Sequence, residues 1–260
     1  MFNKPRLLTP GPTPLPERVR LALAQDMIHH RKPGFKKILL ETETMLQKLF
    51  GTEQPVLPLS CSGTGAMTAA VHGLFLPGET VIVVNGGKFG ERWSKIAAVR
   101  GLKVVEIDVA WGQAVTPAQV EQALREHPEA KGVFMQVCET STAAQHPVEA
   151  IARLTRTREV LLVADGISAV GISPCPMDAW GIDCLLTGLM VPPGMALMAL
   201  SARAWKRAES IPVSCFYFNL AGERDNLLKG QGLFTSPVNL IVGLHESLSM
   251  LFEEGGLDAL

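Results

Sequence analysis

The sequence has no excess of charge of either sign and no long apolar run. Lysine and arginine total 24 against 25 aspartates and glutamates, which gives a formal net charge of −1. Without a basic cluster, neither a nucleic-acid partner nor an anionic membrane surface is expected. No apolar run approaches the roughly 20 residues of a membrane-spanning helix. The N-terminal residues lead into a proline-rich segment, so no signal peptide is predicted.

Paired cysteines and metal-binding spacings are also lacking. The chain has five cysteines and no CxxC pair, which predicts free thiols in a reducing compartment and hence a cytoplasmic protein. The six histidines have no metal-ligand spacing. His29 and His30 are adjacent, and adjacent side chains on a helix face different directions. We therefore predict no metal site.

The pattern of apolar residues indicates an α/β protein. In 260 residues, 47% are hydrophobic, enough for a substantial core. Helices are expected over residues 17–25 and 34–50. After them, short apolar strands alternate with amphipathic helices up to "VLLVADG". The apolar runs Cys184–Leu186 and Met195–Leu200 predict two further buried strands on either side of a Pro-Pro-Gly turn. Such strands predict a mostly parallel sheet covered by helices on both faces.

One strand end has the pattern of a phosphate site. In "SCSGTGAMTAAV", Ser62-Gly63-Thr64 stands between a strand and a helix. Backbone N–H groups at a helix start bind anions, although an ordinary N-cap with a tight turn explains the same residues. A dinucleotide fold would need a glycine at Thr68 and an acid near the next strand end, where Asn85 stands. That alternative is therefore weak.

Three further strand ends carry residues with possible roles. Phe89 in "NGGKFGERW" could stack on a flat ligand or pack under its own helix. Thr140 lies in "CETSTA", where hydroxyl side chains also cap turns. Asp165 ends an apolar strand and could pair with a protonated ring nitrogen or cap the next turn. A phosphate site, an aromatic ring and a buried acid together fit pyridoxal phosphate.

These motifs resemble those of the class V aminotransferases, of the alanine–glyoxylate and serine–pyruvate type. The resemblance covers nearly the whole chain, from "LLTPGPTPLP" and "HHRKPGF" through "SCSGTGAM", "ETSTA" and "ADGISAVG" to "PPGMALMALS". It implies the large domain of the aspartate-aminotransferase fold (type I), with an N-terminal arm over residues 1–20 and a cofactor-binding domain over 21–260. Relatives continue into a smaller C-terminal domain that supplies an arginine for the substrate carboxylate. Nothing in this sequence corresponds to that domain.

The resemblance also implies which residues contact the cofactor. The phosphate would be bound by Ser62, Gly63 and Thr64. Phe89 would stack on one face of the pyridine ring and Ile167 would cover the other, with Thr140 beside its polar edge and Asp165 paired with its nitrogen. Thr235, in "GLFTSPV", would reach the phosphate of the neighbouring subunit in a homodimer.

One expected residue is missing. Relatives read "TGSQKA" or "TGSQKG" here, and their lysine forms a Schiff base with the cofactor and moves a proton on the substrate. In this chain Gly188 is followed directly by Leu189. The sequence assigns no other lysine to the role: Lys206 follows a whole strand later and Lys229 lies in a loop region. Lys88, at a different strand end, is conceivable by position, although a solvated side chain is its default interpretation. Four deleted residues span at most about 14 Å, so a tighter turn and a shifted strand register are possible outcomes.

The expected function follows from the family and from this departure. The family transfers an amino group between a small amino acid (alanine or serine) and a small 2-oxo acid (glyoxylate or pyruvate). The missing lysine puts that activity in doubt. Two alternatives stay open, which are a non-catalytic relative that binds the cofactor or forms dimers, and an incomplete gene product.

Overall fold

The computed structural model describes residues 7–189 and 191–256 of the chain. These residues form a seven-stranded sheet in the order β1-β9-β8-β7-β4-β2-β3. The strand bounds are Val56–Leu59 (β1), Thr80–Asn85 (β2), Lys103–Asp108 (β3), Gly132–Gln136 (β4), Leu161–Asp165 (β7), Cys184–Thr187 (β8) and Ala196–Leu200 (β9). Two short strands, Cys138–Glu139 (β5) and Ala144–Gln145 (β6), form a separate hairpin.

The sheet is mostly parallel, as the apolar pattern predicts. Strands β3, β2, β4, β7 and β8 are parallel to one another, whereas β9 runs antiparallel to both β8 and β1. The pairing of β8 with β9 is regular, from Cys184 opposite Leu200 to Thr187 opposite Leu197. The two apolar runs around the Pro-Pro-Gly segment are therefore adjacent strands. Their pairing is regular although the four residues of the relatives' motif are missing between them.

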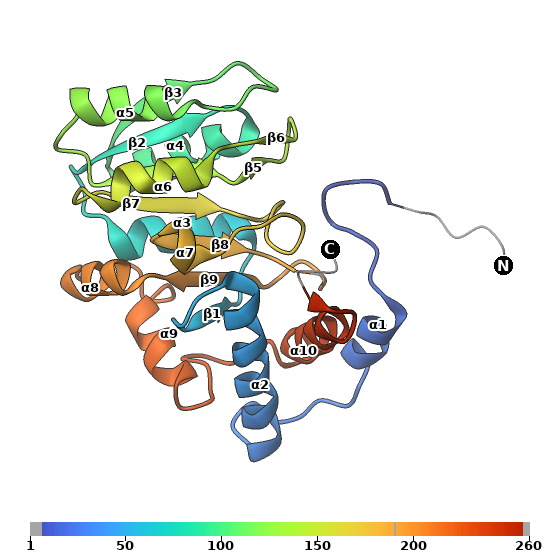
Figure 1. Ribbon diagram of the computed structural model, residues 1–260. Coiled ribbons are helices and arrows are strands. Elements are labelled where there is room, and N and C mark those ends of the chain that lie inside the picture. The colour runs from blue at the N-terminus through green and yellow to red at the C-terminus, as the bar shows by residue number, and fades with distance from the viewer. Residues whose placement is uncertain (1–6, 190, 257–260) are drawn as a thin grey trace.

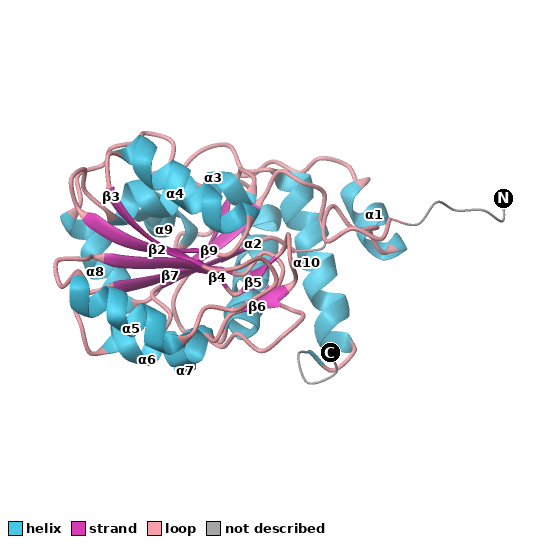
Figure 2. Ribbon diagram, turned by 90° about the horizontal axis from the view of Figure 1, so that it is seen from above, coloured by secondary structure: helices cyan, strands magenta, loops and turns pink. Residues whose placement is uncertain are grey.

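Helices cover both faces of the sheet (Figure 2). Helices α3 (Gly63–Leu74) and α4 (Lys88–Arg100) lie on one face. Helices α5 (Pro117–Glu126), α6 (Val148–Arg156) and α7 (Met177–Trp180) lie on the other. Helix α5 begins with a capping box between Thr116 and Gln119, with Pro117 at its first position.

Three helices form a second layer beside β1 (Figure 1). Helix α10 (Val238–Glu253) packs against α1 (Glu17–Leu23) and α2 (Pro33–Phe50), and α2 contacts β1. Two other helices, α8 (Ala202–Ser210) and α9 (Leu220–Leu227), connect β9 to this layer. The segment from Ala202 to Leu227 was not assigned to helices from the sequence.

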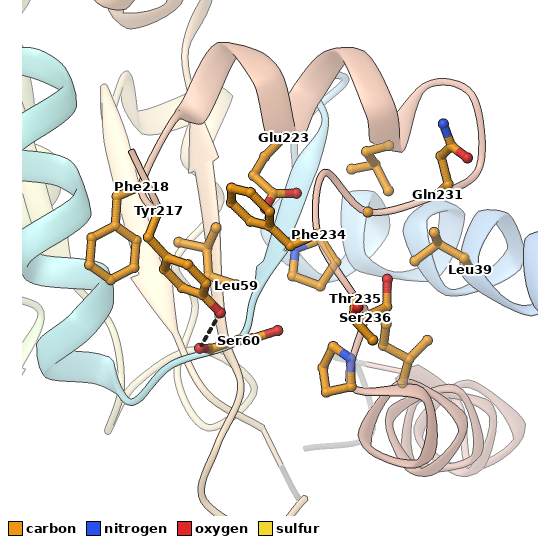
Figure 3. Close-up of a pocket in the computed structure, with 15 residues that line it drawn as sticks. Leu39, Leu59, Ser60, Tyr217, Phe218, Glu223, Gln231, Phe234, Thr235 and Ser236 are labelled. Carbon is orange, nitrogen blue, oxygen red and sulfur yellow. Dashed lines mark hydrogen bonds between the residues drawn. The ribbon is translucent and has the colours of Figure 1, made fainter. Parts of the chain in front are cut away.

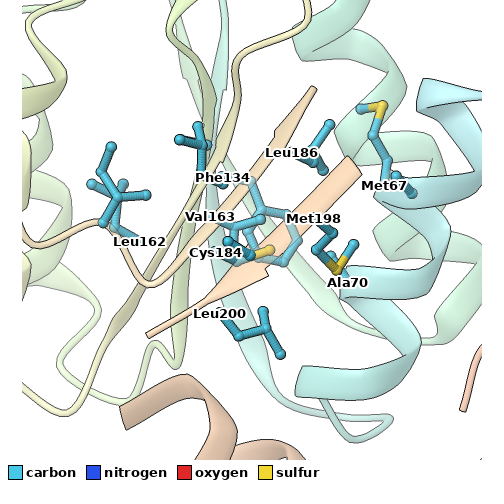
Figure 4. Close-up of a cluster of buried hydrophobic side chains, with 14 of the residues drawn as sticks. Met67, Ala70, Phe134, Leu162, Val163, Cys184, Leu186, Met198 and Leu200 are labelled. Carbon is cyan, nitrogen blue, oxygen red and sulfur yellow. The ribbon is translucent and has the colours of Figure 1, made fainter. Parts of the chain in front are cut away.

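The core lies between the sheet and its helices. Each of the five residues of β4, of β7 and of β9 is buried, which is typical of strands covered on both faces. Figure 4 shows side chains of β8 and β9, including Cys184, Leu186 and Met198, packed near Met67 and Ala70 of α3. Within the described residues, no helix is long and apolar enough to span a membrane.

Candidate functional site

The polar strand ends meet at one edge of the sheet. Parallel strands β2, β4, β7 and β8 have their carboxyl ends on the same side, where ligands bind in open α/β sheets. In Figure 1 the arrowhead of β7 points towards the β5–β6 hairpin, while α8 lies at the opposite end. The sequence motifs after β1, β2, β4 and β7 are therefore brought together by the fold.

The start of α3 has the geometry of an anion site. Ser62 is the N-cap residue in an extended conformation, and its side chain makes no capping hydrogen bond. The ordinary N-cap interpretation of this serine is therefore not realised, and the first-turn N–H groups of this 12-residue helix receive no hydrogen bond from the N-cap side chain. A Cβ atom at Gly63 would lie 2.8 Å from Cδ1 of Ile167, so the present position of the Ile167 side chain depends on a glycine here.

Helix α4 brings a cation to this site. Arg92 Nη1 donates a hydrogen bond to Thr64 Oγ1 at 3.0 Å. The Arg92 guanidinium carbon also lies 4.5 Å from the centroid of the Phe89 ring, within cation–π distance. Arg92 therefore connects the predicted aromatic residue to the predicted phosphate site. It was not identified from the sequence, although it stands in the quoted "GERW" motif.

Glu139 fixes the beginning of α4. Its fully buried carboxylate accepts hydrogen bonds from the backbone N–H groups of Phe89 at 3.2 Å and Gly90 at 3.0 Å. The same carboxylate accepts from the backbone N–H and the hydroxyl of Ser141. A Cβ atom at Gly87 would clash with Ser141 Oγ and would lie 2.7 Å from Glu139 Cδ. A carboxylate at a helix N-terminus is favourable, and here it holds Phe89 in place.

Asp165 is a buried acid at the end of β7. Its Oδ1 accepts a hydrogen bond from the Ile167 N–H at 2.9 Å, so the turn-capping interpretation is realised for this oxygen. Burial raises the pKa of Asp165 to about 6, and the charge of Glu139 adds to the increase. The hydrogen bond from Ile167 and the positive charge of Arg92 lower the pKa in part. A cationic N–H donor would stabilise the ionised form.

A buried amide lies beside Asp165, and two hydroxyl groups join the neighbouring loops. Gln136 pairs in register with Asp165, so the two side chains lie on the same face of the sheet. Gln136 is buried, and among the described residues neither atom of its amide has a hydrogen-bond partner. Thr140 Oγ1 and Ser168 Oγ are 2.5 Å apart, which connects the loop after β5 to the turn after β7. Ser141 and Thr142 form hydrogen bonds within their own turn, as the structural interpretation predicts, and Ser141 Oγ also accepts a hydrogen bond from the backbone N–H of Lys88.

The end of β8 closes the site. Thr187 Oγ1 donates to the carbonyl oxygen of Gly166 at 3.0 Å. Ile167 Cδ1 lies 3.7 Å from the position of a Cβ atom at Gly188, so the Ile167 side chain lies between this strand end and the start of α3. Leu189, which follows directly, packs near Gly171.

Lys88, the candidate to replace the missing lysine, does not point towards Asp165. Lys88 Nζ is 3.3 Å from Glu91 Oε2 and 5.8 Å from the centroid of the Trp111 ring. The Lys88 side chain is 63% exposed. Its backbone N–H donates to Ser141, yet its ammonium group is turned to solvent beside Trp111.

Thr235 is not part of this group of residues. It lines a separate pocket between the end of β1, the segment before α9 and the start of α10 (Figure 3). In that pocket Tyr217 donates a hydrogen bond to the carbonyl oxygen of Ser60 at 3.3 Å and stacks on Phe234. Thr235 therefore stays a predicted contact between subunits.

The residues present fit pyridoxal phosphate. The unclaimed donors of α3 and the cation of Arg92 suit a phosphate, and the buried Asp165 suits a protonated ring nitrogen. Unpartnered amide atoms at Gln136 are a second sign of a polar ligand beside Asp165. The fold and these strand ends define the large domain of a type I aminotransferase fold.

Comparisons with known proteins agree with this assignment of the fold. The pattern of the aminotransferase class-V family matches residues 11–260, and the chain belongs to that family. It is 36% identical to a soluble hydrogenase 42 kDa subunit from Anabaena cylindrica over 98% of this chain and 68% of that protein. It is 31% identical to a serine–glyoxylate aminotransferase from Methylorubrum extorquens, over 96% of this chain and 65% of that protein.

A solved structure has the same fold. The alanine–glyoxylate aminotransferase of Nostoc sp. superposes with a TM-score of 0.92 at 29% identity, covering 99% of this chain and 71% of that one. The family and these neighbours imply pyridoxal phosphate as the cofactor. The chain spans about two thirds of the length of these relatives.

Proposed function

We propose that this chain binds pyridoxal phosphate without a covalent link and descends from enzymes that transfer an amino group between small amino acids and small 2-oxo acids. The donor would be alanine or serine and the acceptor glyoxylate or pyruvate. The convergence of Asp165, Ile167 and the α3 start at one strand edge is the observation that carries the proposal. Relatives named serine–glyoxylate and alanine–glyoxylate aminotransferases support the substrate class.

Each residue has a distinct part in binding. When bound, pyridoxal phosphate supplies an electron-accepting ring for amino-acid chemistry. Asp165 holds a proton on the ring nitrogen through its carboxylate. Ile167 and Phe89 orient the ring and exclude water, and Phe89 is kept in position by Glu139. Backbone N–H groups of α3 and the Arg92 guanidinium bind the phosphate.

The missing lysine limits catalysis. No described lysine side chain forms a hydrogen bond or an ion pair with Asp165 or Thr64, so among the described residues no lysine is assigned to move a proton on the substrate. We therefore expect transamination of alanine with glyoxylate far below the usual enzyme rates of about 1–1000 per second. An active preparation at those rates would refute this part of the proposal.

Thermal unfolding tests the binding proposal. A ligand at about 100 times its Kd stabilises the folded state by about 2.7 kcal/mol. We expect a cooperative transition whose midpoint rises by several degrees with pyridoxal phosphate. A broad transition that the cofactor does not change would favour an incomplete gene product instead.

We further propose a cytoplasmic homodimer. The free cysteines fit a reducing compartment, and the pocket that contains Thr235 opens beside the end of β1, two residues before the phosphate site. A non-catalytic relative whose main role is this dimer is the second candidate. Sedimentation of the chain with and without the cofactor tests the dimer.

A further inference from the structure

A second cavity lies at the opposite edge of the sheet, where the parallel strands begin. Its volume is about 370 Å³. It lies between the starts of β4 and β7 on one side and α8 on the other, so the full lengths of β4 and β7 separate it from Asp165. The residues that line it are mainly cationic: Lys131, Arg158, Glu159, Leu161, Arg203, Lys206, Arg207 and Ser210.

Helix α8 contributes a cationic face to this cavity. Arg203, Lys206 and Arg207 are spaced by three and four residues, which places their side chains on one side of the helix. The opposite side of α8 buries Ala204 and Trp205. The helix is therefore amphipathic: its apolar face is buried in the core, and its cationic face lines the cavity.

Two of the five cations are fixed by the fold. Arg203 is bound to Asp183 and to the backbone carbonyls of Arg158 and Val160. Arg207 is bound to Glu79 and to the carbonyl of Leu74. Both arginines therefore have fixed positions on one side of the cavity, because several partners hold each guanidinium group.

The other three cations are unpaired. Among the described residues, the side chains of Lys131, Arg158 and Lys206 have neither an ion pair nor a hydrogen bond. Glu159 is the single acid among the lining residues, and the chain as a whole has a net charge of −1. Unpaired like charges facing one cavity repel each other, and a multivalent anion would remove that repulsion.

We propose that this cavity binds a compact polyanion that carries two or more phosphate groups. Lysine and arginine both bind phosphate oxygens strongly. The volume of about 370 Å³ is that of a small-molecule pocket, which favours a small anion over a nucleic acid. None of its described lining residues is aromatic, so recognition is of the phosphate groups. They could belong to inorganic pyrophosphate or to a nucleotide tail.

Titration calorimetry of the full chain at constant ionic strength tests the proposal. The probes are pyrophosphate, tripolyphosphate and ATP. The test variant is the double substitution Arg158→Gln/Lys206→Gln. Its matched control is Arg20→Gln/Lys103→Gln, which removes the same charge from exposed positions outside the cavity. Thermal unfolding verifies that both variants are folded.

We expect saturable binding by the parent and by the control, and at least about tenfold weaker binding by the test variant. Tighter binding of ATP than of tripolyphosphate would identify a nucleotide as the source, and equal binding would identify the phosphate groups alone. The proposal is overturned if the parent binds none of the three probes, or if the test and control variants lose affinity equally. It is also overturned if neither variant loses affinity. The last result would place the anion at another site, such as the start of α3.

Discussion

The carboxylate of Glu139 accepts a hydrogen bond from the backbone N–H of Phe89, 50 residues earlier in the chain, at 3.2 Å. This bond joins the hairpin after β4 to the helix after β2. It makes the position of the predicted aromatic ring depend on a buried charge in a different loop.

Substitution of Glu139 should therefore reduce stability. Glu139→Gln keeps an acceptor oxygen but removes the charge from the start of α4, so we expect a loss of about 1–3 kcal/mol in the free energy of unfolding. Urea unfolding measures this loss. The control is Glu149→Gln on α6, an exposed partner of Arg153, which should change stability by less than about 0.5 kcal/mol. Equal effects of the two substitutions would contradict the capping role.

Asp165→Asn should stabilise the cofactor-free chain at neutral and alkaline pH. The pKa of Asp165 is about 6 in the folded chain, above its ordinary value of 3.8. The folded state therefore binds the proton more tightly, and stability falls as pH rises from about 4 to 6. We expect the variant to be more stable by roughly 1–3 kcal/mol at pH 8, with the difference vanishing near pH 4.

Unfolding curves of the parent and the Asp165→Asn variant at several pH values measure this difference in stability. A variant that is destabilised more at pH 8 than at pH 4 would show that the carboxylate has a cationic partner in the cofactor-free protein. With pyridoxal phosphate present, the parent should be more stable than the variant at pH 8, because only the carboxylate can pair with the protonated ring nitrogen.

Arg92→Gln should weaken phosphate binding specifically. The substitution removes the cation beside Thr64, so we expect about tenfold weaker binding of pyridoxal phosphate. Binding of pyridoxal, which has no phosphate, should change little. Lys95→Gln on the same helix is the control, since Lys95 pairs with Glu91 at the surface. Fluorescence titration measures both affinities, and an equal loss for both ligands would contradict a phosphate role.

Gly63→Ala should disturb the cofactor site with little change in stability. The new methyl group would meet Cδ1 of Ile167, the end of a flexible side chain that can rotate away. We expect weaker cofactor binding by about tenfold and a stability change below about 1 kcal/mol. Adding Ile167→Val removes the clashing atom and should restore part of the affinity. Failure of the double variant to recover any affinity would show that the two residues do not share a site.

The sequence predicts the fold class well but not its strand order. Apolar runs such as residues 161–165 identify buried strands, whereas the insertion of β4 between β2 and β7 depends on packing of distant segments. The hairpin of β5 and β6 has only two residues in each strand, too short for any periodicity. Helices α8 and α9 follow the strands without an alternating pattern, so they were missed.

The candidate site is predicted in part. Residues in glycine-rich or acidic motifs, such as Gly63 and Asp165, are recognisable because their chemistry is specific. Glu139 stands in a quoted motif, but its function comes from a contact with α4 that no local pattern reveals. Gln136 looks like a strand residue, and only its burial without partners distinguishes it. Arg92 was missed for the same reason, since its contact with Thr64 joins two helices.

Borohydride reduction of the chain loaded with pyridoxal phosphate, followed by peptide mass spectrometry, tests the central proposal most directly. The account predicts binding with scattered or absent labelling, because Lys88 lies against Glu91 and Trp111 and no described lysine forms a hydrogen bond or an ion pair with Asp165. A single stoichiometric adduct, on Lys88 for example, would contradict it. That result would mean that another lysine replaces the one missing after Gly188, and it would favour a catalytic role for the chain.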